Sequence, residues 1–453
     1  MTKMYRFFVP MMVVLALLSS CKKDKDGGGG GTPAPPKDKI KDTTILYTRD
    51  IYLWYNQIPA SFDAQTYSDP DKIMQAIRKY STESGFTQPV DRWSFAMKKV
   101  EWDDVSGGIA GDFGFSVFFR AEGDLRVKSV EKSSPAGIKG LHRGWRVTKI
   151  NGSTNITTGN ADFIVNAIFY STTGTFTFLK PDGSSVDVTI NAATYQENPI
   201  YLDSVYTAGS KKVGYMVFNS FLGDTNAVYS EFQRIFNRFN AEGVTDVAID
   251  LRYNGGGYVS VQQKLANYLV NSTASGGVMM NQVFNDKYAS WNESDVFSKL
   301  GPLNASRVLF IVSSNTASAS ELLINNLKPY MDVKLVGPGA TYGKPVGYFP
   351  IPVGEWYIFP VSFRSTNKNG QGNYFNGFAV DSQQPDGLDK DWGDVNETAL
   401  ASVLKYVGTG SFTRTTEIPG ASLGSVTPQI INSNQKLDVN SFKGAVLSNR
   451  KFN

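Results

Sequence analysis

The chain has 453 residues, of which 41% are hydrophobic and 19% charged, and its formal net charge of +4 is mild. This length exceeds what one ordinary hydrophobic core holds, so we expect several domains, and the mild charge gives no indication of nucleic-acid binding. A single cysteine excludes intrachain disulfides and sites that need several cysteines, and a single histidine excludes a zinc site of the His-Glu-x-x-His kind.

Residues 1–20 are predicted to be a signal peptide. Two basic residues precede the apolar stretch 7–18, which is too short for an ordinary membrane span. The sequence Leu-Ser-Ser-Cys at its end resembles a bacterial lipobox, which implies that Cys21 is lipidated. The protein would then be anchored in the bacterial cell envelope, on the periplasmic or surface face of a membrane such as the outer membrane; a plain secretory signal is the alternative. Residues 21–41, rich in glycine and proline, are predicted to be a flexible tether.

Residues 42–104 alternate helical patterns with turns, and we expect a small N-terminal helical cap there. Apolar residues that could line two helical faces are Ile45, Tyr47, Ile51, Leu53 and Trp54, and Ile73, Ile77 and Tyr80. Residues 105–195 predict a β-rich module. Its first strand follows residues 111–114, its second strand is near 125–130, and a third at 146–150 ends in an Asn-Gly turn.

The β-rich module resembles a PDZ domain. The resemblance is carried by Ser-Ser-Pro-Ala-Gly at 133–137, Leu-His-Arg-Gly at 141–144 and Ile-Asn-Gly at 150–152. It implies that a loop captures the terminal carboxylate of a peptide, which adds an edge strand. That loop would consist of Phe113, Gly114 and Phe115. The alternative is a module that only packs against its neighbour. His142 lies between a predicted helix and a predicted strand, and we interpret it as solvated or locally hydrogen-bonded rather than catalytic.

Residues 196–408 alternate predicted strands and helices in the manner of an α/β domain. The predicted strands are 213–218, 244–251, 308–312, 333–336 and 357–363, and the predicted helices are 232–239, 259–269, 319–327 and 399–407. Residues 409–453 are polar and contain glycine, proline, serine and asparagine, so we expect a loosely attached C-terminal tail.

Three segments of the predicted α/β domain suit acyl-transfer chemistry. Residues 250–257 end in three glycines after a buried strand, which lets backbone N–H groups face a ligand as an oxyanion hole requires. Residues 316–321 read Thr-Ala-Ser-Ala-Ser-Glu at a strand-to-helix junction, where the helix N-terminus favours a developing anion. Residues 341–344 end in Gly-Lys, and a buried lysine with a lowered pKa can act as a base. Taken singly, each has an ordinary alternative: a turn, a helix N-cap and a solvated charge.

The order of these segments resembles that of the C-terminal processing peptidases, serine peptidase family S41, which includes the tail-specific proteases. The resemblance extends over about residues 90–408, PDZ-like module included. Its further matches are Gly214-Tyr215, Gly377 and Pro385-Asp386. It implies a crotonase-like ββα peptidase domain with Ser318 as nucleophile and Lys344 as general base. It also implies that the backbone N–H groups of Gly257 and Ala319 form the oxyanion hole.

The residues near the predicted dyad differ in part from the family pattern. The serine-to-lysine spacing of the family favours Ser318 over Ser320, so Ser320 is predicted to be a capping or orienting hydroxyl. Many relatives place a glutamine four residues after the lysine, where it orients the amine. Here that position is Tyr348, which becomes a candidate orienting residue. An aspartate that other relatives carry eleven residues after the serine is replaced by Pro329.

The sequence therefore predicts a multidomain α/β protein that acts as a lipid-anchored serine endopeptidase. Its substrates would be proteins or peptides held through disordered C-terminal tails, and its Ser-Lys dyad would need no metal or organic cofactor. The alternative on the same scaffold is a catalytically inactive lipoprotein that binds peptide, lipid or glycan. The sequence indicates no nucleic-acid partner and no particular oligomeric state.

Overall fold

The computed structural model describes residues 38–412, 427–439, 442–450 and 452 of the chain. The predicted signal peptide, Cys21 and most of the predicted tether lie outside the described residues. Helix α1 (Lys39–Ile51) begins inside the stretch predicted as tether, because the Asp38 carboxylate accepts a hydrogen bond from the Ile40 N–H and caps the helix. Within the described ranges, every helix is too short or too polar to span a bilayer.

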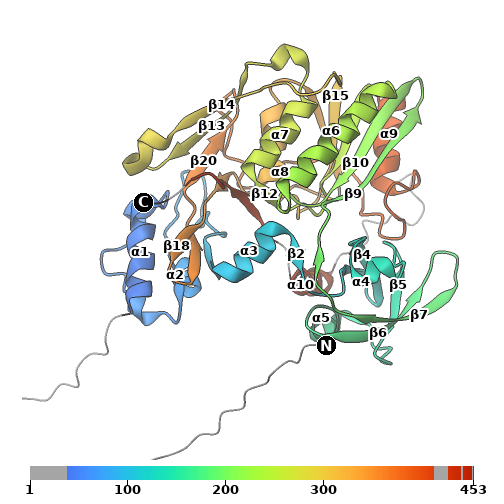
Figure 1. Cartoon of the computed structure of the whole chain (residues 1–453), viewed down its shortest axis with the longest axis horizontal. Helices are drawn as coiled ribbons and strands as arrows, with labels where there is room; N and C mark the ends of the chain where they lie inside the picture. Colours follow the sequence, from blue (N-terminus) through green and yellow to red (C-terminus); the bar gives the residue numbers. More distant parts are fainter. Residues whose placement is uncertain (1–37, 413–426, 440–441, 451, 453) are drawn as a thin grey trace, which may run out of the picture. The chain divides into compact units, whose positions relative to one another are not determined.

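The N-terminal region is largely helical, as predicted for residues 42–104, but it also contains a strand. Strand β1 pairs antiparallel with β19, far along the chain, in a three-stranded sheet of order β1-β19-β18. In Figure 1 the strand labelled β18 lies beside helix α2. Helix α1 ends at Ile51 and the chain is extended at Tyr52, so Leu53 and Trp54 do not belong to the predicted helical face. The elements are η1 (Tyr55–Gln57), η2 (Ala64–Thr66), α2 (Pro70–Ile77), β1 (Phe95–Lys98), α3 (Lys99–Gly107), β18 (Ile351–Val353) and β19 (Trp356–Phe359).

The next part of the chain forms a five-stranded module, an antiparallel sheet of order β3-β4-β5-β6-β7 with its helices. Strand β3 lies at one edge of this sheet. The predicted turn after β5 is present, with φ values of 51° at Asn151 and 84° at Gly152. The elements are β2 (Ile109–Ala110), β3 (Phe115–Ala121), β4 (Asp124–Val130), α4 (Pro135–Ile138), β5 (Arg146–Ile150), η3 (Thr158–Asn160), α5 (Ala161–Phe169), β6 (Thr173–Leu179), β7 (Ser185–Asn191) and β8 (Tyr195–Gln196).

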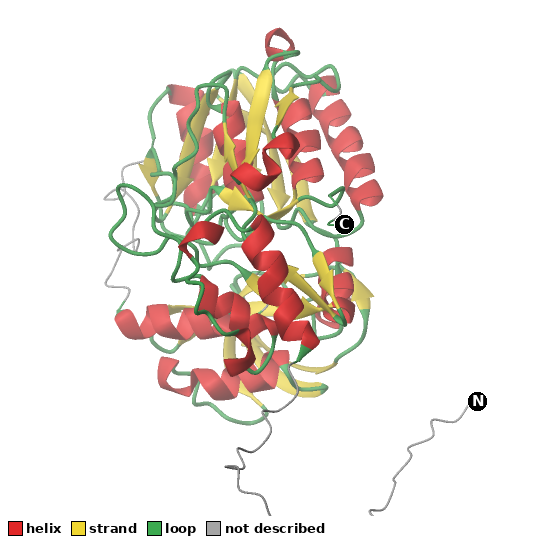
Figure 2. Ribbon diagram, turned by 90° about the vertical axis from the view of Figure 1, so that its left-hand side faces the viewer, coloured by secondary structure: helices red, strands yellow, loops and turns green. Residues whose placement is uncertain are grey.

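A six-stranded sheet of order β21-β16-β15-β11-β10-β9 forms the centre of the following residues, and only β9 is antiparallel to its neighbour. Successive side chains of β10 point to opposite faces: Val213 and Tyr215 pack with α9, whereas Met216 packs with α6, α7 and α8. Helices therefore cover both faces (Figure 2), which explains why the strands are almost continuously apolar. The elements are β9 (Ile200–Ala208), β10 (Lys211–Phe218), α6 (Thr225–Ala241), β11 (Asp246–Asp250), α7 (Val259–Leu269), β15 (Arg307–Ile311), α8 (Ala319–Leu327), β16 (Asp332–Gly337), β21 (Ser382–Gln383) and α9 (Thr398–Thr409).

Residues 357–363, predicted as one strand of the main sheet, instead divide between two smaller sheets. Strand β19 ends at Phe359, and the chain continues through Pro360, which lacks the N–H that a sheet interior requires. Strand β20 then joins a four-stranded sheet of order β14-β13-β20-β17. The elements are η4 (Ser272–Ala274), β13 (Val278–Phe284), η5 (Asp286–Trp291), β14 (Glu293–Val296), β17 (Val346–Gly347) and β20 (Phe363–Thr366).

The described part of residues 409–453 is packed, in contrast to the loosely attached tail predicted from its composition. In helix α10 (Pro428–Leu437), Ile430 and Leu437 are seven residues apart and therefore share one face, which is buried in the core of the five-stranded module. Strand β22 (Gly444–Val446) pairs parallel with β12 (Gly256–Tyr258). Because only one narrow face of α10 is apolar, a polar overall composition concealed this packing.

Candidate active site

Three loops that follow neighbouring parallel strands meet at one edge of the six-stranded sheet. They follow β11, β15 and β16, which are adjacent in the sheet, so the carboxyl ends of these strands lie side by side. In open α/β sheets this edge is where ligands bind. The loops contain the three segments that the sequence indicated, residues 250–257, 316–321 and 341–344, so the fold brings the predicted chemistry together.

Ser318 lies in a strained turn directly before helix α8. Its φ of 58° and ψ of −106° are unusual for a residue with a side chain, and Asn151 is the only other non-glycine residue with positive φ in the described ranges. Thr316 fixes the turn by donating from Oγ1 to the Leu251 carbonyl at 2.8 Å. The side chain of Ser318 is buried, and its Oγ has no hydrogen-bond partner among the described residues. Because an unpaired buried hydroxyl costs free energy, this geometry indicates a role other than packing.

Glu321 connects the serine turn to the lysine loop. Its Oε2 accepts hydrogen bonds from the backbone N–H of Ser318 at 2.9 Å and of Lys344 at 2.8 Å. Its Oε1 accepts from the Gly343 N–H and the Thr341 hydroxyl, both at 2.6 Å. Burial raises the pKa of the Glu321 carboxyl, whereas these four donors act to lower it. One buried carboxylate therefore fixes the distance between the two segments that carry the predicted dyad.

Lys344 is buried, as a lysine base requires. Burial lowers the pKa of its amine well below the ordinary value, although the Asp91 carboxylate acts in the opposite direction. Its Nζ lies 3.8 Å from the centre of the Tyr348 ring and donates a 2.8 Å hydrogen bond to the Lys443 carbonyl. In this structure the amine is therefore directed at the C-terminal segment, and the Oγ of Ser318 receives no hydrogen bond from it.

The glycine loop offers the backbone donors that an oxyanion hole needs. Gly256 and Gly257 have φ values of 108° and 140°, which side chains rarely allow. A Cβ at Gly256 would collide with the Gly444 carbonyl and lie 3.0 Å from the Ala319 N atom. Ala319 is the first residue of α8, so its N–H is among those that a helix leaves unpaired. The predicted donors, Gly257 and Ala319, thus come from two loops that are in contact.

The two residues predicted to orient the lysine have other hydrogen-bond partners. Ser320 donates from Oγ to the Asn254 carbonyl at 3.0 Å and thereby ties helix α8 to the glycine loop. Tyr348 donates from its hydroxyl to the Lys443 carbonyl at 2.9 Å, and it contacts Lys344 through the face of its ring. The orientation of Lys344 therefore depends on a ring and on a backbone carbonyl.

The loop predicted to bind a peptide carboxylate is internally paired. Phe113 and Phe115 are buried in the core of the five-stranded module. The Gly114 N–H donates to the Asp112 carboxylate at 2.8 Å, and a Cβ at Gly114 would collide with Ser134. In this structure the loop therefore does not present a free Gly114 N–H to a peptide terminus.

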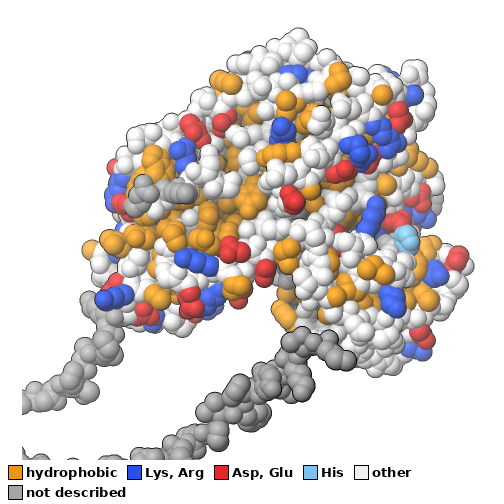
Figure 3. All heavy atoms as spheres, in the orientation of Figure 1, with side chains coloured by type: hydrophobic (Ala, Val, Ile, Leu, Met, Phe, Trp, Pro, Cys, Tyr) orange, Lys and Arg blue, Asp and Glu red, His pale blue; other side chains and the backbone are white. Residues whose placement is uncertain are grey.

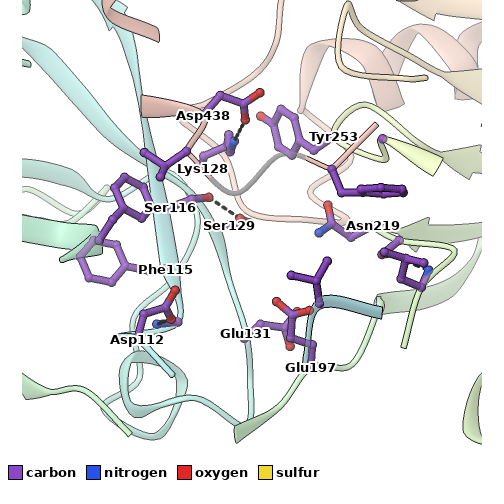
Figure 4. Close-up of a pocket in the computed structure, with 18 of the residues that line it drawn as sticks. Asp112, Phe115, Ser116, Lys128, Ser129, Glu131, Glu197, Asn219, Tyr253 and Asp438 are labelled. Atoms are coloured by element: carbon purple, nitrogen blue, oxygen red, sulfur yellow. Dashed lines mark hydrogen bonds and ion pairs between the residues drawn. The ribbon is translucent and has the colours of Figure 1, made fainter. Parts of the chain in front are cut away.

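A cavity of about 200 Å³ lies between this loop and the glycine loop. Figure 4 shows Asp112, Glu131 and Glu197 on one side of it and Tyr253 on the other. Burial raises the pKa of Glu131 to about 7 and also raises that of Glu197. The two sides of the cavity belong to the module and to the site edge of the main sheet, so the cavity connects the two regions to which peptide binding was assigned.

A buried group of charges joins the five-stranded module to the main sheet. Arg252 donates to Asp250 at 2.7 Å, and it donates to Asp386 and Glu397, both at 2.8 Å. Arg143, in the module, donates to Asp386 at 2.6 Å. Burial raises the pKa of Asp386, but the Arg143 and Arg252 guanidinium groups outweigh it and lower that pKa to about 2. Neighbouring His142, exposed to solvent, pairs through Nδ1 with Asp391 at 2.8 Å, in line with its interpretation as locally hydrogen-bonded.

A metal cluster or a patch of one charge in the described residues would indicate another kind of site. Within those ranges, no three His, Cys, Asp or Glu side chains are placed to hold a metal ion together. On the face drawn in Figure 3, Lys and Arg side chains are interspersed with Asp and Glu, and hydrophobic side chains form a band between them. The clearest concentration of functional groups remains the edge that contains Ser318 and Lys344.

Residues 212–381, which contain all three of these loops, match the sequence model of peptidase family S41. This part of the chain is a peptidase family S41 domain. A sequence assigned as a CtpA-like serine protease of Staphylococcus aureus is 26% identical to the chain over 281 residues, which cover 61% of this chain and 53% of that relative. A Staphylococcus saprophyticus sequence with the same assignment is 26% identical over 300 residues, covering 65% and 57%. The chain thus spans about half the length of the curated relatives that it matches.

The S41 assignment is accompanied by a shared fold. A crystal structure from Bacteroides fragilis, assigned to the S41 proteases, superposes on this chain with a TM-score of 0.67 at 23% identity. The superposition covers 83% of this chain and 99% of that one, so the likeness extends beyond the S41 domain. At this identity it shows the mixed α/β architecture alone.

Two residues of the site were missed in the sequence. Glu321 follows Ser318 by three positions, and this Ser-x-x-Glu spacing is the pattern of a capping box, so a local signal existed. Lys443 contributes only its carbonyl oxygen, which every residue possesses, so its identity carried no signal.

Proposed function

We propose that the protein is a serine endopeptidase in which Ser318 is the nucleophile and Lys344 the general base. The observation that carries this proposal is the Glu321 carboxylate, which holds the backbone N–H groups of both residues on one oxygen. Both side chains are buried, and burial lowers the pKa of Lys344 so that its neutral form can accept a proton. The S41 domain supports a peptidase reaction at this edge.

In the proposed reaction, the Ser318 Oγ attacks the carbonyl carbon of a peptide bond while its proton passes to the neutral amine of Lys344. The backbone N–H groups of Gly257 and Ala319 donate to the developing oxyanion. Lys344 then gives its proton to the leaving amine, and an acyl-enzyme remains on Ser318. Water, deprotonated by Lys344, hydrolyses the acyl-enzyme and restores the serine.

We further propose that the five-stranded module is PDZ-like and binds the C-terminal tail of a substrate. Strand β3 lies at the edge of its sheet and α5 packs on the same core, so an extended peptide could add to β3 beside α5. The contact between Arg143 and Asp386 would hold this groove at a fixed distance from Ser318. A tail bound there would present an upstream peptide bond to the glycine loop.

Lipid anchoring in the cell envelope is also part of the proposal, and it rests on the lipobox-like ending at Cys21. Labelling with a radioactive fatty acid during expression in a bacterium tests it. Wild type should be labelled and recovered with membranes, and Cys21→Ala should be neither. A labelled Cys21→Ala variant would contradict the proposal.

The peptidase proposal is tested by incubating the full chain with a disordered protein that has an apolar C-terminus. Mass spectrometry of the products should show internal cleavage by wild type and none by Ser318→Ala. The same assay is run on Ile430→Asp, a variant whose C-terminal segment should be displaced because Ile430 is buried in the core of the five-stranded module. If wild type and Ile430→Asp are both folded and neither cleaves the substrate, the assignment is contradicted.

A second candidate function, peptide binding without hydrolysis, is favoured by one observation. The Lys344 amine donates to the Lys443 carbonyl, and the Ser318 Oγ is unpaired in the described residues. If this arrangement were permanent, peptides would bind with the same affinity to wild type and to Ser318→Ala, and neither protein would cleave them. Time-resolved cleavage assays at saturating peptide separate the two functions.

A further inference from the structure

Helix α10 occupies the groove that the proposed function assigns to a substrate tail. It lies against β3 and beside α5 (α5 and α10 are labelled in Figure 1), and its Ile430 and Leu437 are buried in the core that these elements share. Ser433 donates from Oγ to the Thr158 carbonyl at 3.0 Å, and Lys436 pairs with Asp162 at 2.7 Å. Apolar, polar and charged contacts together hold the helix in this place.

One side chain of α10 imitates the backbone of an added strand. The Asn434 Oδ1 accepts a hydrogen bond from the Phe119 N–H at 2.8 Å, and its Nδ2 donates to the Phe119 carbonyl at 3.0 Å. Phe119 is in β3, the edge strand whose backbone groups an extended peptide would pair with. A bound substrate strand and Asn434 therefore compete for the same donor and acceptor.

Strand β22 occupies the catalytic cleft in a similar way. The Gly444 N–H donates to the Gly255 carbonyl at 3.0 Å, and the register pairs Gly256 with Gly444 and Gly257 with Ala445. In a parallel ladder of this register the Gly257 N–H points to the Gly444 carbonyl. This N–H is one of the two proposed oxyanion donors. The Gly444 carbonyl therefore takes the place of a substrate carbonyl.

The opposite side of the C-terminal strand is also paired. The Tyr348 N–H donates to the Ala445 carbonyl and the Leu447 N–H to the Tyr348 carbonyl, both at 3.0 Å. One position earlier, the Lys443 carbonyl accepts from Lys344 and from the Tyr348 hydroxyl. The segment is thus held along both edges, as a peptide substrate would be, but the base donates to it and makes no hydrogen bond to the nucleophile.

The end of α10 and the residue after it lie at the cavity between the five-stranded module and the glycine loop. Lys128 of β4 pairs with Asp438, directly after α10, at 3.3 Å (Figure 4). Leu437 and Asp438 line the cavity together with the glycine loop. The described parts of one C-terminal segment therefore contact the tail groove, the cavity and the cleft in succession.

We propose that the C-terminal segment, through its described residues 427–439 and 442–450, is a built-in, substrate-like inhibitor that fills both peptide sites of the folded protein. The inference rests on the proposed function and specifies how that site is regulated: a substrate gains access by displacing α10 from β3 and β22 from the glycine loop. Inhibition, rather than self-cleavage, follows from the hydrogen bond of the Lys344 amine to the Lys443 carbonyl, because the amine makes none to Ser318 and so does not take up its proton.

Point variants of the full chain test the inhibition. Ile430→Asp places a carboxylate in the core of the five-stranded module and should displace α10, whereas Ile431→Asp changes the neighbouring residue, which is 45% exposed. Asn434→Ala removes the pairing with Phe119 and disturbs the core less. We expect Ile430→Asp and Asn434→Ala to raise kcat/KM for a disordered substrate by about ten-fold, the change that a single lost polar or apolar contact typically produces. Ile431→Asp should match wild type.

Peptide binding tests whether the C-terminal segment fills the peptide sites, even if no form of the protein proves to be a peptidase. In a Ser318→Ala background, a fluorescent peptide with the sequence of residues 427–450 should bind to the Ile430→Asp and Asn434→Ala variants at least about ten-fold more tightly than to the protein whose C-terminal segment is unaltered. Urea unfolding shows whether each variant is folded. Two results would overturn the inference: folded Asn434→Ala with unchanged peptide binding, or variants that lose activity and stability together, which would make the segment a structural part.

Discussion

The Nζ atom of Lys344 donates a 2.8 Å hydrogen bond to the carbonyl oxygen of Lys443, which lies 99 positions further along the chain. The Tyr348 hydroxyl donates to the same oxygen at 2.9 Å. The C-terminal segment thus contributes to the burial that lowers the pKa of Lys344, and it also accepts a hydrogen bond from the amine, which makes none to Ser318. Displacing the segment would free the base and at the same time expose it to water, so regulation and catalysis are coupled at this lysine.

Ser318→Ala should abolish hydrolysis and leave the free energy of unfolding nearly unchanged, because the Oγ has no partner to lose in the described residues. Ser320→Ala is the matched control, since it removes one hydroxyl two positions away. It loses the bond to the Asn254 carbonyl, so we expect partial activity and a stability loss of about 1 kcal/mol. Peptide hydrolysis and urea unfolding measure both effects. An inactive Ser320→Ala beside an active Ser318→Ala would reassign the nucleophile.

Glu321→Gln should impair both folding and activity. The amide replaces one of the two carboxylate oxygens by an NH2 group, which is a donor. This group would face the N–H or hydroxyl groups that donate to the carboxylate in wild type. Leaving buried donors unsatisfied costs about 1–3 kcal/mol each, so we expect at least about 2 kcal/mol of destabilisation and a reduced kcat. Glu101→Gln, on the exposed surface of α3, serves as control and should change the unfolding free energy by less than about 0.5 kcal/mol. Equal stability of the two variants would show that Glu321 does not hold the loops together.

Glu131→Gln should remove a pH dependence of stability. Burial raises the pKa of Glu131 from 4.5 to about 7, against the hydrogen bond from the Asn198 N–H. Between pH 4.5 and about 7 the folded protein keeps a proton that the unfolded chain loses, so the free energy of unfolding of wild type falls across this range. Above pH about 7 both states have lost the proton, and the free energy of unfolding falls no further on this account. In urea unfolding at pH 8 the variant should exceed wild type by on the order of 2–3 kcal/mol, and at pH 4 the two should agree. A constant difference across this range would contradict the raised pKa.

The elements with local signals could be predicted from the sequence. Helices α7 and α8 begin and end at the predicted residues, because apolar side chains at helical spacing and a flanking Pro329 define them within a few turns of chain. Strands β1 and β22 were missed because each is short and depends on a partner far along the chain. Pairing of that kind leaves no periodic pattern in the strand itself.

The residues of the candidate site likewise divide into those with a local signal in the sequence and those without one. Ser318, Lys344 and the glycine loop could be indicated because each has a characteristic residue type at a strand end. The role of Tyr348 could not, because a tyrosine may contact a lysine through its hydroxyl or through its ring, and only the fold places the ring at 3.8 Å. The polar sequence of α10 concealed its binding face, since the decisive contact there is made by an amide, Asn434, with backbone atoms.

Lys344 should add a second pH dependence of stability, at pH values between its lowered pKa and 10.5. Burial lowers the pKa of its amine well below the ordinary 10.5. Between the lowered pKa and 10.5 the unfolded chain binds a proton that the folded protein does not, so the stability of wild type should rise with pH across this window. Lys344→Met removes the titrating group and should flatten this rise in urea unfolding. A rise of the same size in Lys344→Met would show that another group causes it.

The activity should follow the same titration in the same direction. Only the neutral amine can accept the Ser318 proton, so kcat/KM should increase with pH through an apparent pKa below 10.5 and then level off. Lys344→Arg keeps the positive charge but cannot deprotonate, so it should be as inactive as Lys344→Met at every pH. The profiles are best recorded on the wild-type chain, in which the amine is buried as in the structure. A Lys344→Arg protein that retained most of the rate would show that this residue only positions the substrate, and the proton would then have to leave Ser318 by another route.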